Sequence, residues 1–144
     1  METQTYANHR RVFPPFHQVL LPLLLLTLIG SVVNLYQSLG DHQRLYSASL
    51  IVVLVISAIM IALISRVFAL KAQDRAIRAE ENLRHFVLTG KLLDPKLAVL
   101  QIVALRFAPD SEFVALARKA ADENMTPDAI KRAVKQWRAD TYRV

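Results

Sequence analysis

Two long stretches without a formal charge constrain the fold of this chain most strongly. Between Arg11 and Asp41 lie 29 such residues, and between Arg44 and Arg66 lie another 21. Each stretch holds an apolar core, residues 19–33 and 48–64. At about 1.5 Å per helical residue, each stretch is long enough to cross a hydrocarbon layer about 30 Å thick. A soluble domain has no use for two such runs joined by a short polar link. The sequence therefore predicts an all-α membrane protein built on a two-helix transmembrane hairpin.

The pattern predicts four parts. Residues 1–17 form a cytoplasmic N-terminal tail, and residues 18–70 form the transmembrane hairpin, with spans at about 18–37 and 46–67 and an outer loop at 38–45. Residues 67–89 contain neither proline nor glycine, so the second helix should continue as a charged stalk over 71–90 and end at Gly90. Acid-before-base pairs four residues apart support that helix: Asp74–Arg78, Glu80–Arg84 and Glu81–His85. Residues 91–144 should form a small helical cytoplasmic domain.

The leading apolar run also has features of a secretory signal peptide. Arg10 and Arg11 would be its basic region and residues 20–29 its apolar stretch. However, no small-x-small cleavage site follows, since Gly30-Ser31-Val32 fits that pattern poorly. We therefore expect this segment to be a permanent anchor.

Positive charges near the ends of the spans predict the orientation. Only Arg44 lies in the connecting loop, whereas six basic residues lie near the other ends of the two spans. Because cytoplasmic loops carry the excess of lysine and arginine, both termini should be cytoplasmic. The six residues are Arg10, Arg11, Arg66, Lys71, Arg75 and Arg78.

Small and polar residues form a stripe on one face of each span. Such faces let membrane helices approach closely and form hydrogen bonds where lipid offers no partner. The two stripes could pack against each other within the hairpin, which we favour, or one could face another subunit. Asn34 is the residue to follow. Its amide would cost about 1–3 kcal/mol if left unpaired in hydrocarbon, so we expect it to lie against protein rather than lipid. The candidate helix–helix contacts are Thr27, Gly30, Ser31 and Asn34 in the first span and Ala58, Ala62 and Ser65 in the second.

Three shorter helices with clear start signals follow the stalk. Asp94-Pro95 should open a helix that runs to Ala108, and Pro109-Asp110-Ser111 and Thr126-Pro127-Asp128 should open the next two. The first is apolar nearly all round, so it should be the buried centre of a small bundle. The alternative is a separate amphipathic segment that lies in the inner headgroup layer. The predicted core residues are Leu100, Leu105 and Trp137, with Trp137 on the buried face of the last helix.

Basic residues near the membrane and on the last helix suggest contacts with anionic lipid headgroups or with a protein partner. Residues 71–144 hold 14 lysines or arginines against 10 acidic residues, an excess too modest to favour nucleic acid. The last helix also opens with Pro127-Asp128-Ala129, which is unlike a base-reading helix. The candidate contacts are Arg66, Lys71, Arg75 and Arg78 beside the second span and Lys131, Lys135 and Arg138 on the last helix.

The sequence offers few catalytic signals. There is no cysteine, only three glycines occur, and the four histidines are scattered. Only His85 has a carboxylate at helical spacing, Glu81, and Asp41-His42 provides two adjacent ligands rather than a metal site. We therefore expect no catalytic residues, no metal site, no cofactor and no small-molecule substrate.

Three segments resemble the signature of a family of small two-span bacterial membrane proteins, which is catalogued only as a domain of unknown function. They are residues 66–84 (RVFALKAQDRAIRAEENLR), 104–107 (ALRF) and 137–144 (WRADTYRV). The resemblance runs from about Phe16 to the C-terminus. It implies a multi-pass protein of the bacterial inner membrane with the same layout, and it carries over no catalytic or cofactor residue.

Two classes of function remain. The chain could be a non-catalytic accessory or structural subunit of a larger membrane complex, docking through its membrane helices and helical tail. Alternatively, it could be a membrane-anchored adaptor or regulator whose basic tail binds a cytoplasmic protein or anionic lipid headgroups. Other membrane subunits, or a second copy of the chain, are the expected partners.

Overall fold

Every regular element is a helix in the computed structural model, which describes residues 4–8 and 12–140. Two helices, Pro15–Gln37 and His42–Thr89, are long and apolar enough to cross a membrane. Only 6% of the apolar window of the first and 11% of that of the second is buried. The chain divides into two compact units, residues 12–68 and residues 1–11 with 69–144, and helix α2 (His42–Thr89) contributes to both. Arg10 and Arg11, on which the predicted orientation partly relies, lie outside the described residues.

The first helix begins with an unusually wide turn. A π-helix, η1 (Pro15–Leu20), continues directly into α1 (Leu21–Gln37), and the N–H of Leu21 donates to the carbonyl of Phe16, five residues back. Pro22 follows immediately and has no N–H to donate, so a local irregularity is expected at this place. The chain accommodates this proline by widening one turn.

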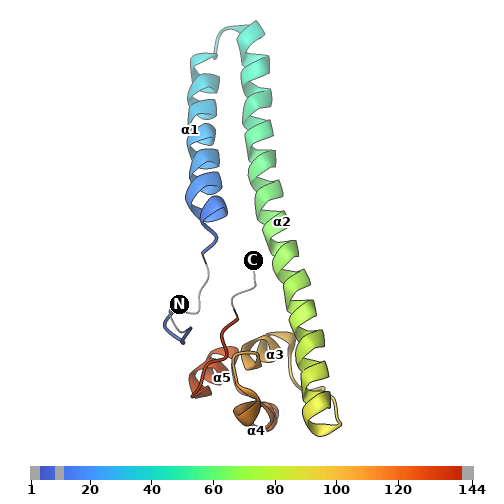
Figure 1. Cartoon of the computed structure of the whole chain (residues 1–144). Coiled ribbons are helices and arrows are strands. Elements are labelled where there is room, and N and C mark those ends of the chain that lie inside the picture. Colours follow the sequence, from blue (N-terminus) through green and yellow to red (C-terminus); the bar gives the residue numbers. More distant parts are fainter. Residues whose placement is uncertain (1–3, 9–11, 141–144) are drawn as a thin grey trace. The chain divides into compact units, whose positions relative to one another are not determined.

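Helix α1 and residues 42–68 of α2 lie side by side in their unit (Figure 1). The least exposed positions on each helix recur at spacings of three and four, which is the repeat of a coiled-coil seam. The buried seam residues are Ser31, Ser38, Ala48 and Val55, none of them large, so the helices can approach closely. The seam consists of Leu21, Leu24, Leu28, Ser31 and Leu35 on α1, Ser38 directly after α1, and Leu45, Ala48, Val52, Val55, Ile59, Ala62 and Arg66 on α2.

The link between α1 and α2 is shorter than the predicted outer loop of residues 38–45. Gly40 adopts a φ of 101°, a left-handed conformation that glycine tolerates. The Asp41 carboxylate then accepts the N–H groups of Gln43 and Arg44 at 3.1 and 3.3 Å. Because this side chain caps the helix, α2 begins at His42 rather than near residue 46.

The second unit contains a bundle of three short helices, α3 (Val99–Leu105), α4 (Asp110–Asp122) and α5 (Pro127–Ala133) (Figure 1). Helix α3 packs against both α4 and α5, so it is the centre of the bundle, as its apolar sequence predicts. The largest fully buried side chains are Phe107, Phe113, Leu105 and Ile130. The predicted core position of Leu105 is therefore confirmed, whereas that of Leu100 is wrong, because Leu100 is 58% exposed.

The start of α3 differs from the prediction. The Asp94 carboxylate accepts the N–H of Lys96 at 2.8 Å, and its carbonyl accepts the N–H of Leu97 at 3.0 Å. These bonds close a separate turn, so Asp94-Pro95 does not open the helix, which begins at Val99.

The last helix ends earlier than predicted. Val134 is extended, with ψ at 120°, so α5 stops at Ala133 and Lys135, Trp137 and Arg138 lie beyond it. The Glu112 carboxylate of α4 accepts the N–H groups of Lys135 and Gln136 at 2.9 and 3.1 Å. This contact removes the donors that another helical turn would need. The predicted basic stripe Lys131, Lys135 and Arg138 therefore does not lie on one helix face. Trp137 is half-buried, and the centre of its ring lies 4.6 Å from the centre of the Phe107 ring.

The remaining helix ends follow their sequence signals. Helix α2 ends at Thr89, and Gly90 follows with a φ of 74°, as predicted. Helix α4 ends at Asp122, Asn124 follows with a φ of 47°, and the N–H of Met125 donates to the carbonyl of Ala120 at 3.1 Å. Asparagine tolerates this left-handed conformation better than most residues.

Candidate functional site

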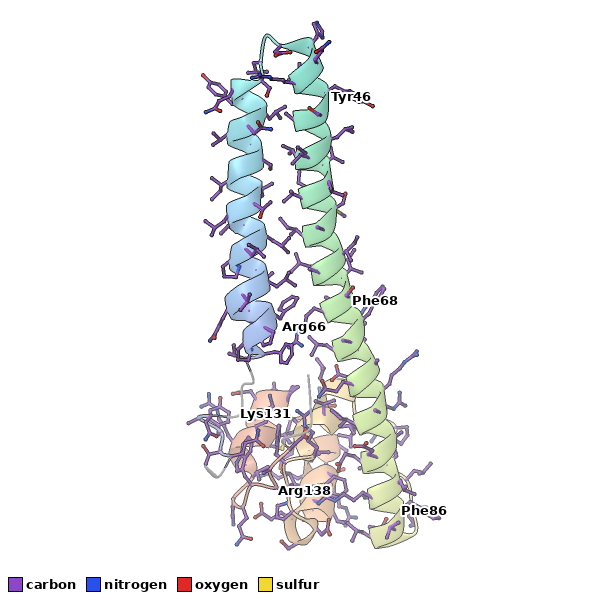
Figure 2. The ribbon with its side chains drawn as sticks, turned by 45° about the horizontal axis from the view of Figure 1, so that its top comes forward. Tyr46, Arg66, Phe68, Phe86, Lys131 and Arg138 are labelled. Atoms are coloured by element: carbon purple, nitrogen blue, oxygen red, sulfur yellow. The ribbon has the colours of Figure 1, made fainter. Side chains whose placement is uncertain are left out.

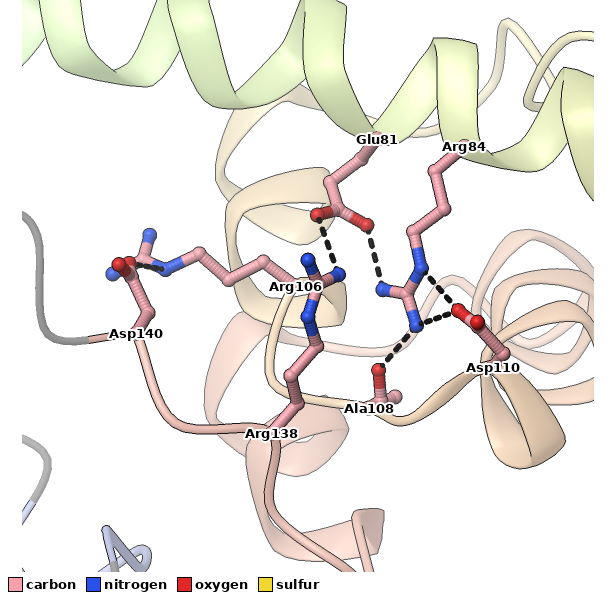
Figure 3. A network of polar contacts seen from close by, with 7 residues as sticks. All are labelled: Glu81, Arg84, Arg106, Ala108, Asp110, Arg138 and Asp140. Carbon is pink, nitrogen blue, oxygen red and sulfur yellow. Dashed lines mark hydrogen bonds and ion pairs between the residues drawn. The ribbon is translucent and has the colours of Figure 1, made fainter.

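The most polar feature of the second unit is an ion-pair cluster of Glu81, Arg84, Asp110 and Arg138, where the end of α2 meets the bundle (Figure 3). Glu81 is only 4% exposed. One of its carboxylate oxygens lies 2.9 Å from Nη1 of Arg84, and the other lies 3.8 Å from Nη1 of Arg138. A carboxylate buried this deeply is stabilised by its pairing with these two guanidinium groups.

Arg84 joins three parts of the chain. Its Nε donates to Asp110 at 2.7 Å, its Nη2 donates to the carbonyl of Ala108 at 2.8 Å, and its guanidinium lies 4.2 Å above the ring of Phe113. The hydrogen bonds use the N–H groups at the edge of the guanidinium, and the contact with Phe113 uses its flat face. The end of α2 is therefore fastened to α4 and to the loop before it.

The acid–base pairs predicted along α2 are wrong. Arg84 pairs with Glu81, three residues before it, rather than with Glu80. Within the described residues, neither Asp74–Arg78 nor Glu81–His85 forms an ion pair. His85 instead places Nδ1 2.7 Å from the carbonyl of Lys91 and helps to fix the chain after Gly90.

A second buried arginine fastens the C-terminal segment to the bundle. The Arg106 side chain is 10% exposed, its Nε lies 2.8 Å from the Asp140 carboxylate, and its guanidinium lies 4.5 Å above the ring of Phe107 (Figure 3). The N–H of Asp140 donates to the side chain of Gln4 at 2.8 Å. Both ends of the described chain thus meet on this unit.

The N-terminal segment also docks on α5. The hydroxyl of Tyr6 donates to the Asp128 carboxylate at 2.6 Å, while Nε of Arg132 lies 3.2 Å from that hydroxyl and 2.9 Å from Asp128. The Tyr6 hydrogen bond, followed by the charge of Arg132, lowers the pKa of Asp128 below its ordinary value. The hydrogen bond with Tyr6, followed by the charge of Asp128, raises the pKa of Arg132. The sequence predicts a cytoplasmic N-terminal tail over residues 1–17 but not this contact, because no local pattern indicates it.

A shallow groove of about 540 Å³ lies over the ion-pair cluster. Its lining includes the carboxylates of Glu81 and Asp110, both of which are already paired with arginine. Within the described ranges, no group of three or more His, Asp or Glu side chains could hold a metal ion. The paired groups in this groove fasten helix α2 to α4 and to the loop before it. The lining residues are Glu80, Glu81, Arg84, Pro109, Asp110 and Arg138.

Gln101 makes a further set of polar contacts that the sequence alone does not predict. It is 6% exposed on α3, its side-chain oxygen accepts the N–H of Ala98 at 2.6 Å, and its amide nitrogen donates to the carbonyl of Met125 at 2.7 Å. One amide therefore caps α3 and connects it to the loop before α5. Its position within an apolar helix was the available signal.

The predicted basic contacts divide into exposed and engaged residues. Arg66 is half-buried, with its guanidinium 5.7 Å from the ring centre of Phe16 (Figure 2). The backbone N–H of Arg138 donates to the carbonyl of Phe107, and its side chain forms an ion pair with Glu81. Lys131 is half-buried, and the remaining four are exposed: Lys71, Arg75, Arg78 and Lys135.

The predicted helix–helix contacts are only partly brought together. Ser31 is buried on the seam, and Ala58 and Ala62 are half-buried. Thr27, Gly30, Asn34 and Ser65 are exposed, so the seam between α1 and α2 does not include them. The physical reason is that the seam follows a 3.5-residue repeat through leucines, one position away from the small-residue stripe.

Comparison with known proteins identifies a family but no characterised relative. The model of a family described as a family of unknown function, DUF6526, matches residues 1–144. No curated protein and no solved structure matches the chain.

Proposed function

The chain belongs to the DUF6526 family, and we propose that it is a two-span membrane protein that acts as a non-catalytic accessory subunit of a larger membrane complex. The observation that carries this proposal is the position of Asn34. Its side chain is exposed on the apolar surface of α1, and within the described residues it has no side-chain hydrogen-bond partner. An amide in hydrocarbon is stabilised by a partner from another helix, so Asn34 supports docking to a second protein.

The surface of the unit formed by residues 12–68 supports a membrane location. Large apolar side chains are left exposed on both helices, including Leu26 at 67% and Leu54 at 68%. Water would make such a surface unfavourable, whereas acyl chains cover it without penalty. The count of basic residues supports an orientation with both termini in the cytoplasm, and the family resemblance supports the bacterial inner membrane.

The exposed small residues of α1 form a suitable docking face. A Cβ atom added to Gly30 would meet no atom within 4 Å, so this position is open to an approaching helix. Thr27 lies near Gly30 on the exposed side, and its hydroxyl is satisfied by the carbonyl of Leu23 at 2.8 Å. An approaching helix would thus meet three different groups on this face: Gly30 without a side chain, the Thr27 hydroxyl with its hydrogen bond already made, and the Asn34 amide, which has no side-chain partner within the described residues.

The test is extraction of the full chain in mild detergent, native separation and identification of what migrates with it. Asn34→Leu should weaken the association, whereas Val33→Leu, an apolar change at a neighbouring exposed position, should retain it. If both variants migrate with the same partners in the same proportion, Asn34 is not the docking contact. If the wild-type chain migrates alone or is found in the soluble fraction, the accessory-subunit proposal is wrong.

A second candidate is a membrane-anchored adaptor or regulator. It is favoured by apolar side chains that the second unit leaves exposed after forming its own core: Leu83, Phe86, Val87, Leu92 and Leu100. Substitution of Leu92 and Leu100 by serine separates the two candidates. Loss of a cytoplasmic partner with the membrane partners retained would favour the adaptor.

A further inference from the structure

The part of α2 in the second unit has two opposite faces. Ile77 and Glu81 are buried, at 6% and 4% exposed, and Glu81 is paired with Arg138 beyond α5. On another side, five exposed residues recur at spacings of four and three, and Phe86 projects away from the bundle helices (Figure 2). We call this row the α2 stripe: Ala72, Ala76, Ala79, Leu83 and Phe86.

We propose that the α2 stripe binds the same stripe of a second copy of this chain in a parallel coiled coil. The spacing of four and three is that of the a and d positions of a heptad. Alanine at three positions permits a close approach, while Leu83 and Phe86, 62% and 50% exposed, provide large side chains to bury. The inference rests on the proposed membrane location in one respect: two copies inserted in the same way present their α2 helices in the same direction.

The charges beside the stripe fit a parallel pair of identical chains. With Ala76 and Leu83 at a positions, Arg75 is at a g position and Glu80 at the following e position. In a parallel coiled coil, a g residue faces the e residue five positions later on the partner, so Arg75 would face Glu80 of the second copy. Two-fold symmetry repeats this attraction.

The same two residues disfavour the alternative orientation and are available for pairing. An antiparallel pair brings g positions to g positions and e positions to e positions, so no opposite charges would meet. Both side chains are exposed, and within the described residues neither forms an ion pair or a side-chain hydrogen bond. The opposite charge that each of these two side chains lacks among the described residues of its own chain is provided by the second copy across the proposed interface.

The stripe covers about two heptads, so the pair should be weak between dilute molecules in solution. Anchoring both chains in one membrane raises their effective concentration. The test therefore uses the full chain in native-like membranes.

Because the chain has no cysteine, single cysteines can report on this contact directly. The variants are Ala72→Cys, Ala76→Cys and Ala79→Cys, with Arg78→Cys as an exposed control on another face. After mild oxidation, all three stripe variants should give a disulfide-linked dimer, with yields at least about fivefold above the control, because facing a and d positions bring the Cα atoms within disulfide reach. Crosslinking at only one of the three, or equal crosslinking at residue 78, would overturn the parallel pairing.

The charges are tested in the Ala79→Cys background. Arg75→Glu places like charges opposite each other twice and should lower the crosslinked fraction about fivefold. Adding Glu80→Arg in the same chain should restore it, because the pairs are then reversed but opposite. Failure of the double variant to recover would overturn the proposed register.

Membrane fractionation of the same samples separates failure of this inference from failure of the proposed function. A membrane-integrated chain without stripe crosslinks overturns only the self-association. A chain recovered in the soluble fraction overturns the membrane proposal itself.

Discussion

The two units of this chain bury opposite kinds of side chain. In the unit of residues 12–68, two of the four buried positions are the serines Ser31 and Ser38, while leucines cover the outside. In the other unit, Phe107 and Phe113 are buried and most charged side chains lie outside. Under the proposed membrane location, the two units face two solvents. Lipid gives no reward for burying leucine, so close backbone approach decides the packing, whereas water rewards the burial of large apolar groups. We call the unit that contains α3, α4 and α5 the water-facing unit.

The largest expected effect is in the core of the water-facing unit. Phe113→Ala removes a fully buried ring beneath Arg84 and should lower the free energy of unfolding by about 3–5 kcal/mol. Chemical unfolding of the full chain in detergent, followed by the fluorescence of its single tryptophan, measures this change. Val87→Ala is the control, since Val87 is 74% exposed, lies outside the α2 stripe and should change stability little. Equal losses would mean that the core assignment is wrong.

Two leucines of similar exposure test whether the units face different solvents. Leu26 is 67% exposed in the apolar unit, and Leu100 is 58% exposed in the other. Leu26→Arg should impair membrane insertion, at a cost of about 2.5–3.5 kcal/mol at the centre of a span, whereas Leu100→Arg should be tolerated. The fraction of chain that resists carbonate extraction from membranes provides the measurement. Equal behaviour of the two variants would break the comparison.

The buried carboxylate tests how the water-facing unit holds α2. Glu81→Ala leaves Arg84 without its partner at 2.9 Å, although Asp110 and the Ala108 carbonyl remain. We therefore expect a loss of about 2–3 kcal/mol, less than for a buried pair with no other partner. Glu80→Ala, an exposed neighbour that forms no ion pair within the described residues, should have almost no effect on the same unfolding curve.

Trp137 should matter less than a core residue. Because it is half-buried and packs on Phe107 from outside the helices, Trp137→Ala should cost about 1–3 kcal/mol rather than the value for full burial. Circular dichroism must replace fluorescence here, since no other tryptophan exists. Trp137→Phe keeps the ring contact and should recover most of the loss.

Local sequence was sufficient for several elements of the fold. The charge-free stretches located both apolar helices, Gly90 located the end of α2, and Thr126 caps α5 by accepting the N–H of Ala129 at 3.2 Å. These signals act within one or two helical turns, so a single sequence contains them. Leu100 shows the limit: α3 is apolar on nearly every side, so periodicity could not identify which residue would be exposed.

The cluster could not be predicted because its contacts span long distances along the chain. Asp110 was expected only to start a helix, and its pairing with Arg84 joins residues 26 positions apart. The end of α5 depends likewise on Glu112, which binds two N–H groups 23 and 24 residues later. Such contacts follow from tertiary packing, which can override the local preferences of a segment.

The smallest effect concerns Tyr6, the side chain that attaches the N-terminal segment to the water-facing unit. Its hydroxyl is the main cause of the lowered pKa of Asp128, so Tyr6→Phe should raise that pKa toward its ordinary value. A carboxyl whose pKa is lower in the folded than in the unfolded state stabilises the fold above its unfolded-state pKa, and this contribution is lost as the pH falls through the folded-state pKa. The variant should therefore be slightly less stable than the wild type near neutral pH and equal to it in acid. Carbon-detected NMR titration of the Asp128 carboxyl measures the shift directly. Tyr46→Phe, in the other unit, is the control and should leave it unchanged; an unchanged pKa in Tyr6→Phe as well would show that Arg132 alone sets the charge of Asp128 and that the N-terminal segment is not held at α5.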